Sequence, residues 1–218
     1  MSATTFLRVF IVGLAAAILA PARADVPKHS RPERRVLYNF DGDSCMFTRA
    51  GGKGPVPITV DDLKTLIDEV TRPGSRVDTI LVCINAQVTY YPTRVGTLRG
   101  GNSTPEERAK WPATENQRST NLKAFFDAGI DPYAVMLAEA RKKGREALLS
   151  FRVNDAHGND FLRTRFWAEH PQCRLPRGAL DFGRDEVREY VFRLIEEAVQ
   201  RYDCDGIELD FNRFPTLF

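Results

Sequence analysis

Residues 204–215 read Cys-Asp-Gly-Ile-Glu-Leu-Asp-Phe-Asn-Arg-Phe-Pro and alternate strictly between apolar and polar side chains. This alternation predicts a β-strand over residues 206–211, with one apolar face made of Ile207, Leu209 and Phe211. The other face carries Glu208, Asp210 and Asn212. Because burying unpaired carboxylates is costly, these acids are expected to be paired, to bind a cation or to line a wet cleft. Of these three options, acids that line a wet cleft indicate a hydrolase active site.

Outward from this strand, the chain alternates strands with helices. Strands are predicted at residues 36–40, 77–85, 147–153 and 206–211. Helices are predicted from Thr59 to Pro73-Gly74, from Asp131-Pro132 to Gly144, and over residues 185–202, with a further helical region ending near Gly129. Two segments, residues 86–118 and 154–183, are predicted to be long loops.

This order of elements predicts an α/β fold with a parallel sheet and right-handed crossovers. An open doubly wound sheet would favour a glycine-rich turn after the first strand, and Phe40-Asp41-Gly42-Asp43 lacks it. A (β/α)8 TIM-barrel type is therefore favoured. Residues 36–218 contain only four of the eight strands. They are expected to form the N-terminal half of a barrel, either truncated or a half barrel, with uncovered edges that promote self-association or unstable folding.

The N-terminus predicts export. Arg8 precedes an apolar run over residues 9–20, and Ala22-Arg23-Ala24 matches a signal-peptidase site, so residues 1–24 are interpreted as a cleavable signal peptide. The run is short for a membrane span, although an uncleaved anchor is the alternative. Residues 25–35 form a polar linker. The mature protein is expected to be secreted or periplasmic, with no stable membrane span.

Net charge and cysteine content limit the binding partners, disulfides and metal sites that are expected. The formal net charge is +2 and no basic block occurs, which argues against nucleic acid and anionic membranes. The four cysteines are Cys45, Cys83, Cys173 and Cys204. Export permits disulfides, and the expected pair is Cys45 with Cys173, since both fall in loops. No zinc-type spacing is present, and no cofactor or metal is expected.

Glu208 and Asp210 are the candidate catalytic residues. Their Cα atoms lie about 6–7 Å apart on one face of a strand. Neighbouring carboxylates push their pKa values apart, so that one acts as general acid while the other stays charged. Which of the two donates the proton is left open. The structural alternative is that Asp210 only positions Arg213 or an arginine of the neighbouring strand.

The other predicted strands also end in polar residues. Ser150, Arg152 and Asn154 share the inward face with the acids, and an arginine inside an apolar strand requires a partner. The candidate substrate-binding residues are Asp41, Asn85, Arg152, Asn154, Asp155, His157, Asn212 and Arg213. Aromatic residues of the long loops would either stack on sugar rings or pack the loops: Tyr90, Tyr91, Trp111 and Trp167.

These motifs resemble the bacterial glycoside-hydrolase-like barrel proteins described as family-10-like glycosyl hydrolases. The similarity extends over most of the mature chain and is specific only at the fourth strand, residues 205–215. Other similar points are the strand end Phe151-Arg152-Val153-Asn154-Asp155 and the helix entry Gly129-Ile130-Asp131-Pro132. It implies a TIM barrel that binds or cleaves a carbohydrate. The chitinase-type motif aligns less well, because Asn212 stands where that motif has its catalytic acid.

The leading hypothesis is an exported glycoside hydrolase. An acid of the fourth strand would protonate the glycosidic oxygen, and a second carboxylate would act as nucleophile or base. Locally that second group is the other member of the Glu208–Asp210 pair, or Asp41. The alternatives are a non-catalytic glycan-binding or envelope protein, a metal-dependent hydrolase using Asp41, Asp43, His157 and Asp210, and an incomplete fragment.

Overall fold

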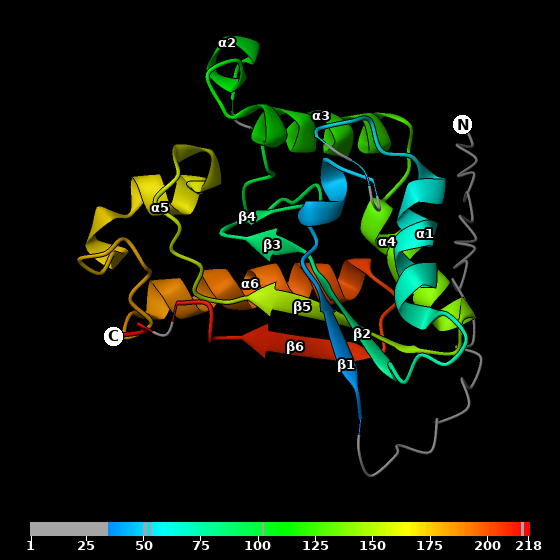
Figure 1. Ribbon diagram of the computed structural model, residues 1–218. Helices are drawn as coiled ribbons and strands as arrows, with labels where there is room; N and C mark the ends of the chain where they lie inside the picture. The colour runs from blue at the N-terminus through cyan, green and yellow to red at the C-terminus, as the bar shows by residue number, and fades with distance from the viewer. Residues whose placement is uncertain (1–34, 50–51, 53, 102, 215) are drawn as a thin grey trace, which may run out of the picture. The chain divides into compact units, whose positions relative to one another are not determined.

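Four parallel strands form the central sheet of the computed structural model, which describes residues 35–49, 52, 54–101, 103–214 and 216–218 (Figure 1). The strands are β1 (Leu37–Phe40), β2 (Thr79–Cys83), β5 (Glu146–Arg152) and β6 (Gly206–Asp210). Their order in the sheet, β1-β2-β5-β6, is also their order in the sequence. A doubly wound sheet reverses strand order at its switch point, and the described sheet has no such reversal. The predicted α/β fold with a parallel sheet is confirmed.

Helices connect these strands. The longer ones are α1 (Val60–Thr71), α3 (Ala113–Asp127), α4 (Pro132–Lys142) and α6 (Asp185–Arg201). The shorter elements are α2 (Pro105–Arg108), α5 (Arg165–Glu169) and the 3-10 turns η1 (Ser44–Met46), η2 (Asp160–Leu162) and η3 (Pro171–Cys173). A small antiparallel hairpin, β3 (Asn85–Ala86) and β4 (Val88–Thr89), follows β2.

The helix starts that the sequence predicts are built as expected. The Thr59 hydroxyl accepts from the backbone N–H of Asp62, whose carboxylate accepts from the Thr59 N–H, forming a capping box at α1. Asp131 caps α4, and its carboxylate also receives Arg201 Nη2 of α6 at 2.8 Å. One acidic residue therefore both starts α4 and links it to the last turn of α6.

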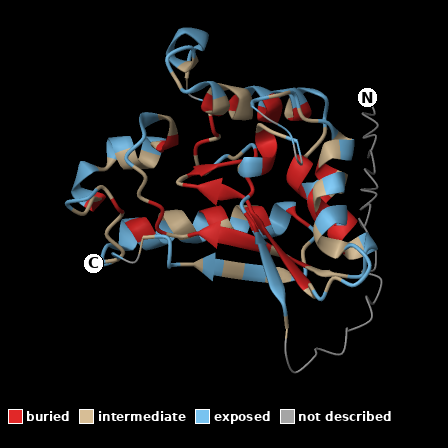
Figure 2. Cartoon of the chain, in the orientation of Figure 1, coloured by how far each residue is buried: buried red, intermediate tan, exposed pale blue. Residues whose placement is uncertain are grey.

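The core lies between one face of the sheet and the helices. Alternate side chains of β2 and β5, among them Ile80, Val82, Ala147 and Leu149, belong to one buried cluster. Leu63 and Ile67 of α1 and Met136, Leu137 and Ala140 of α4 complete it. Figure 2 shows β2 and β5 buried along their length. Because these residues occupy alternate positions of each strand, the residues between them point to the opposite face of the sheet.

The two outer strands are exposed. Leu37 of β1 is 51% exposed, and Ile207 and Leu209 of β6 are each 41% exposed. In Figure 2, β1 is mostly pale blue and β6 alternates tan and pale blue, while the strands between them are mostly buried. The apolar face that the sequence predicts for β6 is thus present in the geometry but not covered by the described residues.

The two segments predicted to be loops contain regular structure. Residues 86–118 include the β3–β4 hairpin, α2 and the start of α3, and residues 154–183 include η2, α5 and η3. The loop prediction was wrong for residues 113–118, the start of α3, because three of the five buried residues of this helix, Glu115, Ser119 and Asn121, are polar. Polar side chains that pack through hydrogen bonds leave no apolar stripe in the sequence. The helical region predicted to end near Gly129 is the remainder of α3.

The predicted disulfide between Cys45 and Cys173 is wrong, because all four cysteines are free thiols. Cys45 Sγ donates to the carbonyl of Gly42 at 3.2 Å, and Cys83 Sγ donates to the carbonyl of Asn85 at 3.2 Å. Burial raises the pKa of Cys83 to about 11 and raises that of Cys45 further. Both thiols lie inside the α/β unit, and neither is bonded to Cys173, which lies in η3.

We expect four thiols per chain to react with Ellman's reagent in denaturant without reductant. In the native protein Cys45 and Cys83 should react slowly at pH 8, because burial and a raised pKa keep the thiolate fraction low. The variants Cys45→Ser and Cys83→Ser should leave unchanged the fast phase of the reaction with Ellman's reagent in the native protein. A count of two in denaturant would instead mean that one disulfide had formed.

The predicted signal peptide at residues 1–24 and nearly all of the predicted linker at 25–35 lie outside the described residues. Residues 34–218 form one compact unit. Among the helices that the structure describes, none has the length and hydropathy needed to span a bilayer.

Candidate functional site

The strand register brings the polar strand ends together. Cys83 of β2 lies beside Ser150 of β5, which lies beside Glu208 of β6. One step further, Arg152 lies beside Asp210. These pairs belong to the face opposite the helix-covered core, as the alternation predicts. The sequence therefore placed the acids of β6 correctly with respect to the polar residues of β5.

Glu208 and Asp210 are half-buried, and each has one oriented oxygen. The Ser150 hydroxyl donates to Glu208 Oε2, and Ser150 is itself almost fully buried. Asp210 Oδ1 accepts from the backbone N–H of Asn212 at 2.8 Å, which shapes the loop after β6. The second oxygen of each carboxylate has no such bond among the described residues, so each acid keeps an acceptor or proton-donor position.

Arg152 connects two other acids of the site. Its guanidinium pairs with Asp41 Oδ1 after β1, and its Nη1 lies 3.9 Å from Asp155 Oδ2. The carboxylate of Asp155 is fully buried and also contacts His157 Nδ1. The prediction that Arg152 needs a carboxylate partner is confirmed, but the partner is Asp41 rather than Asp210. Asp155 and His157, expected at an open mouth, form a pair in which the Asp155 carboxylate is buried and the His157 side chain is 33% exposed.

The Asp41-Gly42-Asp43 turn holds a group of charges that the sequence did not reveal. A Cβ at Gly42 would lie 1.6 Å from the carbonyl oxygen of Cys83, so only glycine allows this turn to rest on the end of β2. Beyond it, Asp43 pairs with Arg99 at 2.8 Å, and Arg99 also pairs with Glu115. The Arg99 side chain is 2% exposed. An arginine in a loop gives no sequence signal of such burial.

Of the remaining predicted binding residues, two use their side chains in hydrogen bonds within the protein and two are exposed. The Asn85 side chain donates to the carbonyl of Arg152 and accepts from its N–H, both at 3.0 Å, so its amide is used by the backbone of β5. The Asn154 amide nitrogen donates to the carbonyls of Phe214 and Thr216. Asn212 and Arg213 are exposed on the loop after β6. The two exposed residues are the ones available to a large ligand.

The metal-binding alternative receives no geometric support within the described ranges. No group of three or more His, Cys, Asp or Glu side chains there could hold a metal ion. Of the four residues named for such a site, three are paired elsewhere: Asp43 with Arg99, Asp41 with Arg152 and His157 with Asp155. The fourth, Asp210, accepts from the backbone N–H of Asn212.

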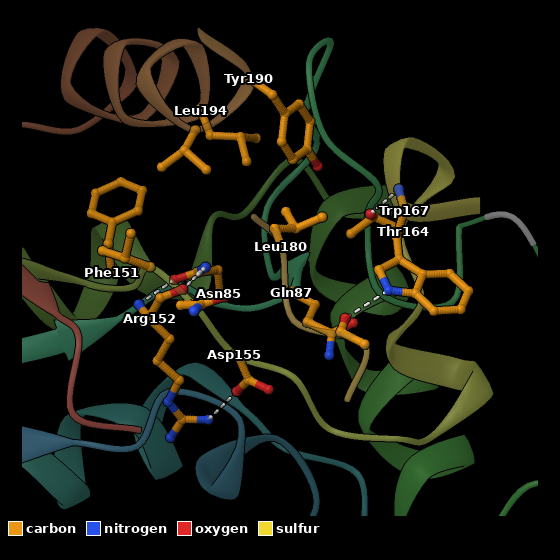
Figure 3. Close-up of a pocket in the computed structure, with 14 residues that line it drawn as sticks. Asn85, Gln87, Phe151, Arg152, Asp155, Thr164, Trp167, Leu180, Tyr190 and Leu194 are labelled. Atoms are coloured by element: carbon orange, nitrogen blue, oxygen red, sulfur yellow. Dashed lines mark hydrogen bonds and ion pairs between the residues drawn. The ribbon is translucent and has the colours of Figure 1, made fainter. Parts of the chain in front are cut away.

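Two hollows lie near the strand ends. One is a narrow cavity of about 40 Å³ lined by the ends of β3 and β5 and by α6, with Arg152 and Asp155 on its polar side (Figure 3). The other is a broad groove of about 660 Å³ lined by residues that include Glu107, Lys110, Trp111 and Asp160. Glu208 and Asp210 are absent from the lining of both.

The loop aromatics have different environments. Tyr90 and Tyr91 are fully buried and pack the interior. The guanidiniums of Arg163 and Arg174 lie 3.9 and 3.5 Å from the Trp167 ring centre, and its Nε1 donates to the carbonyl of Gly178. Trp111 lines the broad groove, so it is the aromatic of this set best placed to meet a sugar ring.

The fold and the site define an α/β protein with acids and arginine gathered at the carboxyl ends of a parallel sheet. No protein-family model matches the chain. Over 97 residues the chain is 27% identical to the glycosyl hydrolase YngK of Bacillus subtilis (strain 168). This match covers 41% of the chain and 19% of YngK, and it supports the glycoside-hydrolase-like class.

Two solved glycosidase structures are also similar. The noncanonic maltogenic alpha-amylase AmyB from Thermotoga neapolitana superposes with a TM-score of 0.46 at 14% identity, over 81% of this chain and 38% of that chain. The galactosidase domain of alpha-galactosidase-sucrose kinase AgaSK gives 0.44 at 16% identity, over 81% and 21%. The chain spans less than half the length of each of these relatives.

Proposed function

We propose that this is a glycoside-hydrolase-like protein that hydrolyses the glycosidic bonds of an oligosaccharide or polysaccharide. The observation that carries the proposal is the pair Glu208 and Asp210, which lie on one face at the carboxyl end of β6 with one oriented oxygen each. The sequence similarity to YngK supports the same class.

The chemistry follows from the arrangement of carboxylates. One acid of β6 would protonate the leaving oxygen, and a second carboxylate would attack the sugar carbon or activate water. Asp41 is the candidate for that second role from another strand, since it follows β1 and pairs with Arg152. Its side chain is 46% exposed, so it remains accessible to a ligand.

We further propose that the sheet represents four strands of a (β/α)8 barrel. Its strand order has no reversal, and its outer strands β1 and β6 expose apolar side chains that further strands, or a second copy, would cover. We also propose that residues 1–24 direct export of the protein. A secreted or periplasmic location would bring the protein to polymeric carbohydrate.

The experiment that tests hydrolysis combines two measurements on the purified chain. A panel of oligosaccharides is assayed for release of reducing ends, and each sugar is titrated by calorimetry. Release of new reducing ends, lost on heat denaturation, would support the hydrolase. Saturable binding without release for every sugar that binds would contradict it and favour a binding protein.

Non-catalytic glycan binding is the second candidate, and a specific observation favours it. Each acid of β6 already has one oxygen bonded to the protein, and neither acid lines either of the two hollows described above. The broad groove beside Trp111 instead has the size of a small-ligand site. The same calorimetric titration, repeated with Trp111→Ala, would show whether binding depends on this groove.

A further inference from the structure

The narrow cavity beside the strand ends combines an apolar wall with a polar wall. Val191 and Leu194 of α6 form part of the apolar wall, and Tyr190 adds its ring and a buried hydroxyl group. Gln87, Asn154 and Asp155 belong to the polar wall. Figure 3 shows Tyr190 and Leu194 on one side and Asp155 with Arg152 on the other. A ligand here would contact carbon surface and one hydroxyl on the α6 side and oxygen atoms on the other side.

Three buried acceptor atoms of the polar wall have no hydrogen-bond partner in the protein. They are Gln87 Oε1, Asn154 Oδ1 and Asp155 Oδ2. Asn154 and Asp155 are only 3% and 6% exposed. A buried acceptor left without a donor destabilises the folded protein, because it has lost its hydrogen bonds to water. The cavity therefore requires a guest that donates hydrogen bonds.

The orientation of both amides is set by their nitrogen atoms. Gln87 Nε2 donates to the carbonyl of His157 at 3.0 Å, and Asn154 Nδ2 donates to the carbonyls of Phe214 and Thr216. Turning either amide over would place two oxygen acceptors against each other. The oxygens of both side chains are thus the atoms left for a guest.

The charge of the cavity wall is balanced. Asp155 is the acidic residue of the wall, with Arg152 Nη1 at 3.9 Å and the His157 N–H donating to its other oxygen at 3.1 Å. Arg152 is shared with Asp41, which lies outside the cavity lining. A cation is not required to neutralise Asp155, so the chemistry favours a neutral donor such as a hydroxyl group.

The volume limits the guest to a few atoms. About 40 Å³ holds about three water molecules, whereas a sugar ring is several times larger. We propose that this cavity binds a short hydroxylated carbon segment of a polyol or sugar, such as a hydroxymethyl arm. Each hydroxyl donates to one of the three acceptors, so a glycerol-like segment can satisfy all three and a hydroxymethyl arm only one, while the carbons contact α6. The inference rests on the proposed function only in taking carbohydrate as the ligand class.

Backbone conformation supports a specialised role for Gln87. This residue adopts φ +56° between β3 and β4, a left-handed conformation that favours glycine or asparagine. Retaining a glutamine there costs of order 1 kcal/mol or more. Its side-chain oxygen in the cavity wall gives a reason for keeping that residue in an unfavourable conformation.

The test uses glycerol as the probe and propan-1-ol as the matched compound with a single hydroxyl. Trp167 lines the cavity, and its indole N–H provides a local NMR signal, one of two indole signals in the chain. We expect glycerol to shift this signal saturably in the millimolar range and propan-1-ol to leave it in place. A parallel titration with methyl glucopyranoside shows whether the arm of a sugar ring also enters, or only a free polyol.

Two variants and one control make the outcome specific. Val191→Phe fills the cavity from α6, and Gln87→Gly removes an acceptor while relieving the backbone strain; each should weaken glycerol binding at least tenfold. Val199→Phe makes the same substitution at a residue of α6 that is itself 45% exposed. This variant should bind glycerol like the parent.

No saturable shift with glycerol would mean that the cavity holds water only, and this result overturns the proposal. Equal affinity in folded Gln87→Gly and parent also overturns it, as does an equal response to propan-1-ol. Because glycerol has no glycosidic bond, these outcomes are independent of whether the protein hydrolyses any sugar.

Discussion

Glu208→Gln and Asp210→Asn, made separately, should each lower kcat/KM on a cleaved oligosaccharide by about 10²–10⁴-fold, the usual contribution of a positioned acid or base. The amides keep the shape of each side chain, so Ser150 and the Asn212 N–H retain an acceptor. The free energy of unfolding should change little, because both residues are half-buried at an open edge. Initial rates of reducing-end release measure the effect.

The same variants can distinguish the two acids. The variant that lacks the proton donor should recover much of its rate on an aryl glycoside with an acidic phenol as leaving group, since such a group needs no protonation. The other variant should stay slow on both substrates. Glu196→Gln, an exposed residue of α6, is the matched control. Full hydrolysis by both Glu208→Gln and Asp210→Asn would rule out catalysis by this pair.

Arg152→Met should lower the free energy of unfolding by about 3–5 kcal/mol, the usual effect of removing one partner from a buried ion pair. Arg152 is 9% exposed, and its loss would leave the fully buried Asp155 carboxylate with His157 alone. Asp41 contributes less to this loss because nearly half of its side chain is exposed. Urea unfolding followed by circular dichroism measures the change.

The double variant Arg152→Met with Asp155→Leu tests the cause. Removing both charges should restore part of the lost stability, because no uncompensated carboxylate remains buried. Arg213→Met is the control, since Arg213 is exposed and should change stability by about 0.5 kcal/mol or less. A loss below about 1 kcal/mol in Arg152→Met would show that the pair is not energetically coupled to folding.

Several features could be predicted because they depend on neighbours in sequence. The alternation of residues 206–211 predicted β6, the Thr59–Asp62 spacing predicted the start of α1, and Asp131-Pro132 predicted the start of α4. The polar residues of β5 and β6 were assigned to one face by counting in twos, and the register confirms it. Local periodicity carries this information because backbone geometry repeats every two or 3.6 residues.

Other features could not be predicted because they depend on residues far apart in sequence. Arg152 and Asp41 are separated by 111 positions, and nothing local indicates that Arg152 turns to Asp41 rather than to the adjacent Asp210. The burial of Arg99 with Glu115 and the state of the cysteines are of the same kind. Each is decided when β1, β2 and the long connections pack together.

The sequence alone determined a parallel α/β chain with acids at the end of its last described strand, since side-chain periodicity and caps are local properties. Only the tertiary structure decided which acids are paired, which amide oxygens are left without donors, and that Gly42 must lie against β2. Burial and hydrogen bonding depend on which atoms meet in space, and that is set by the strand register and by the loops above it.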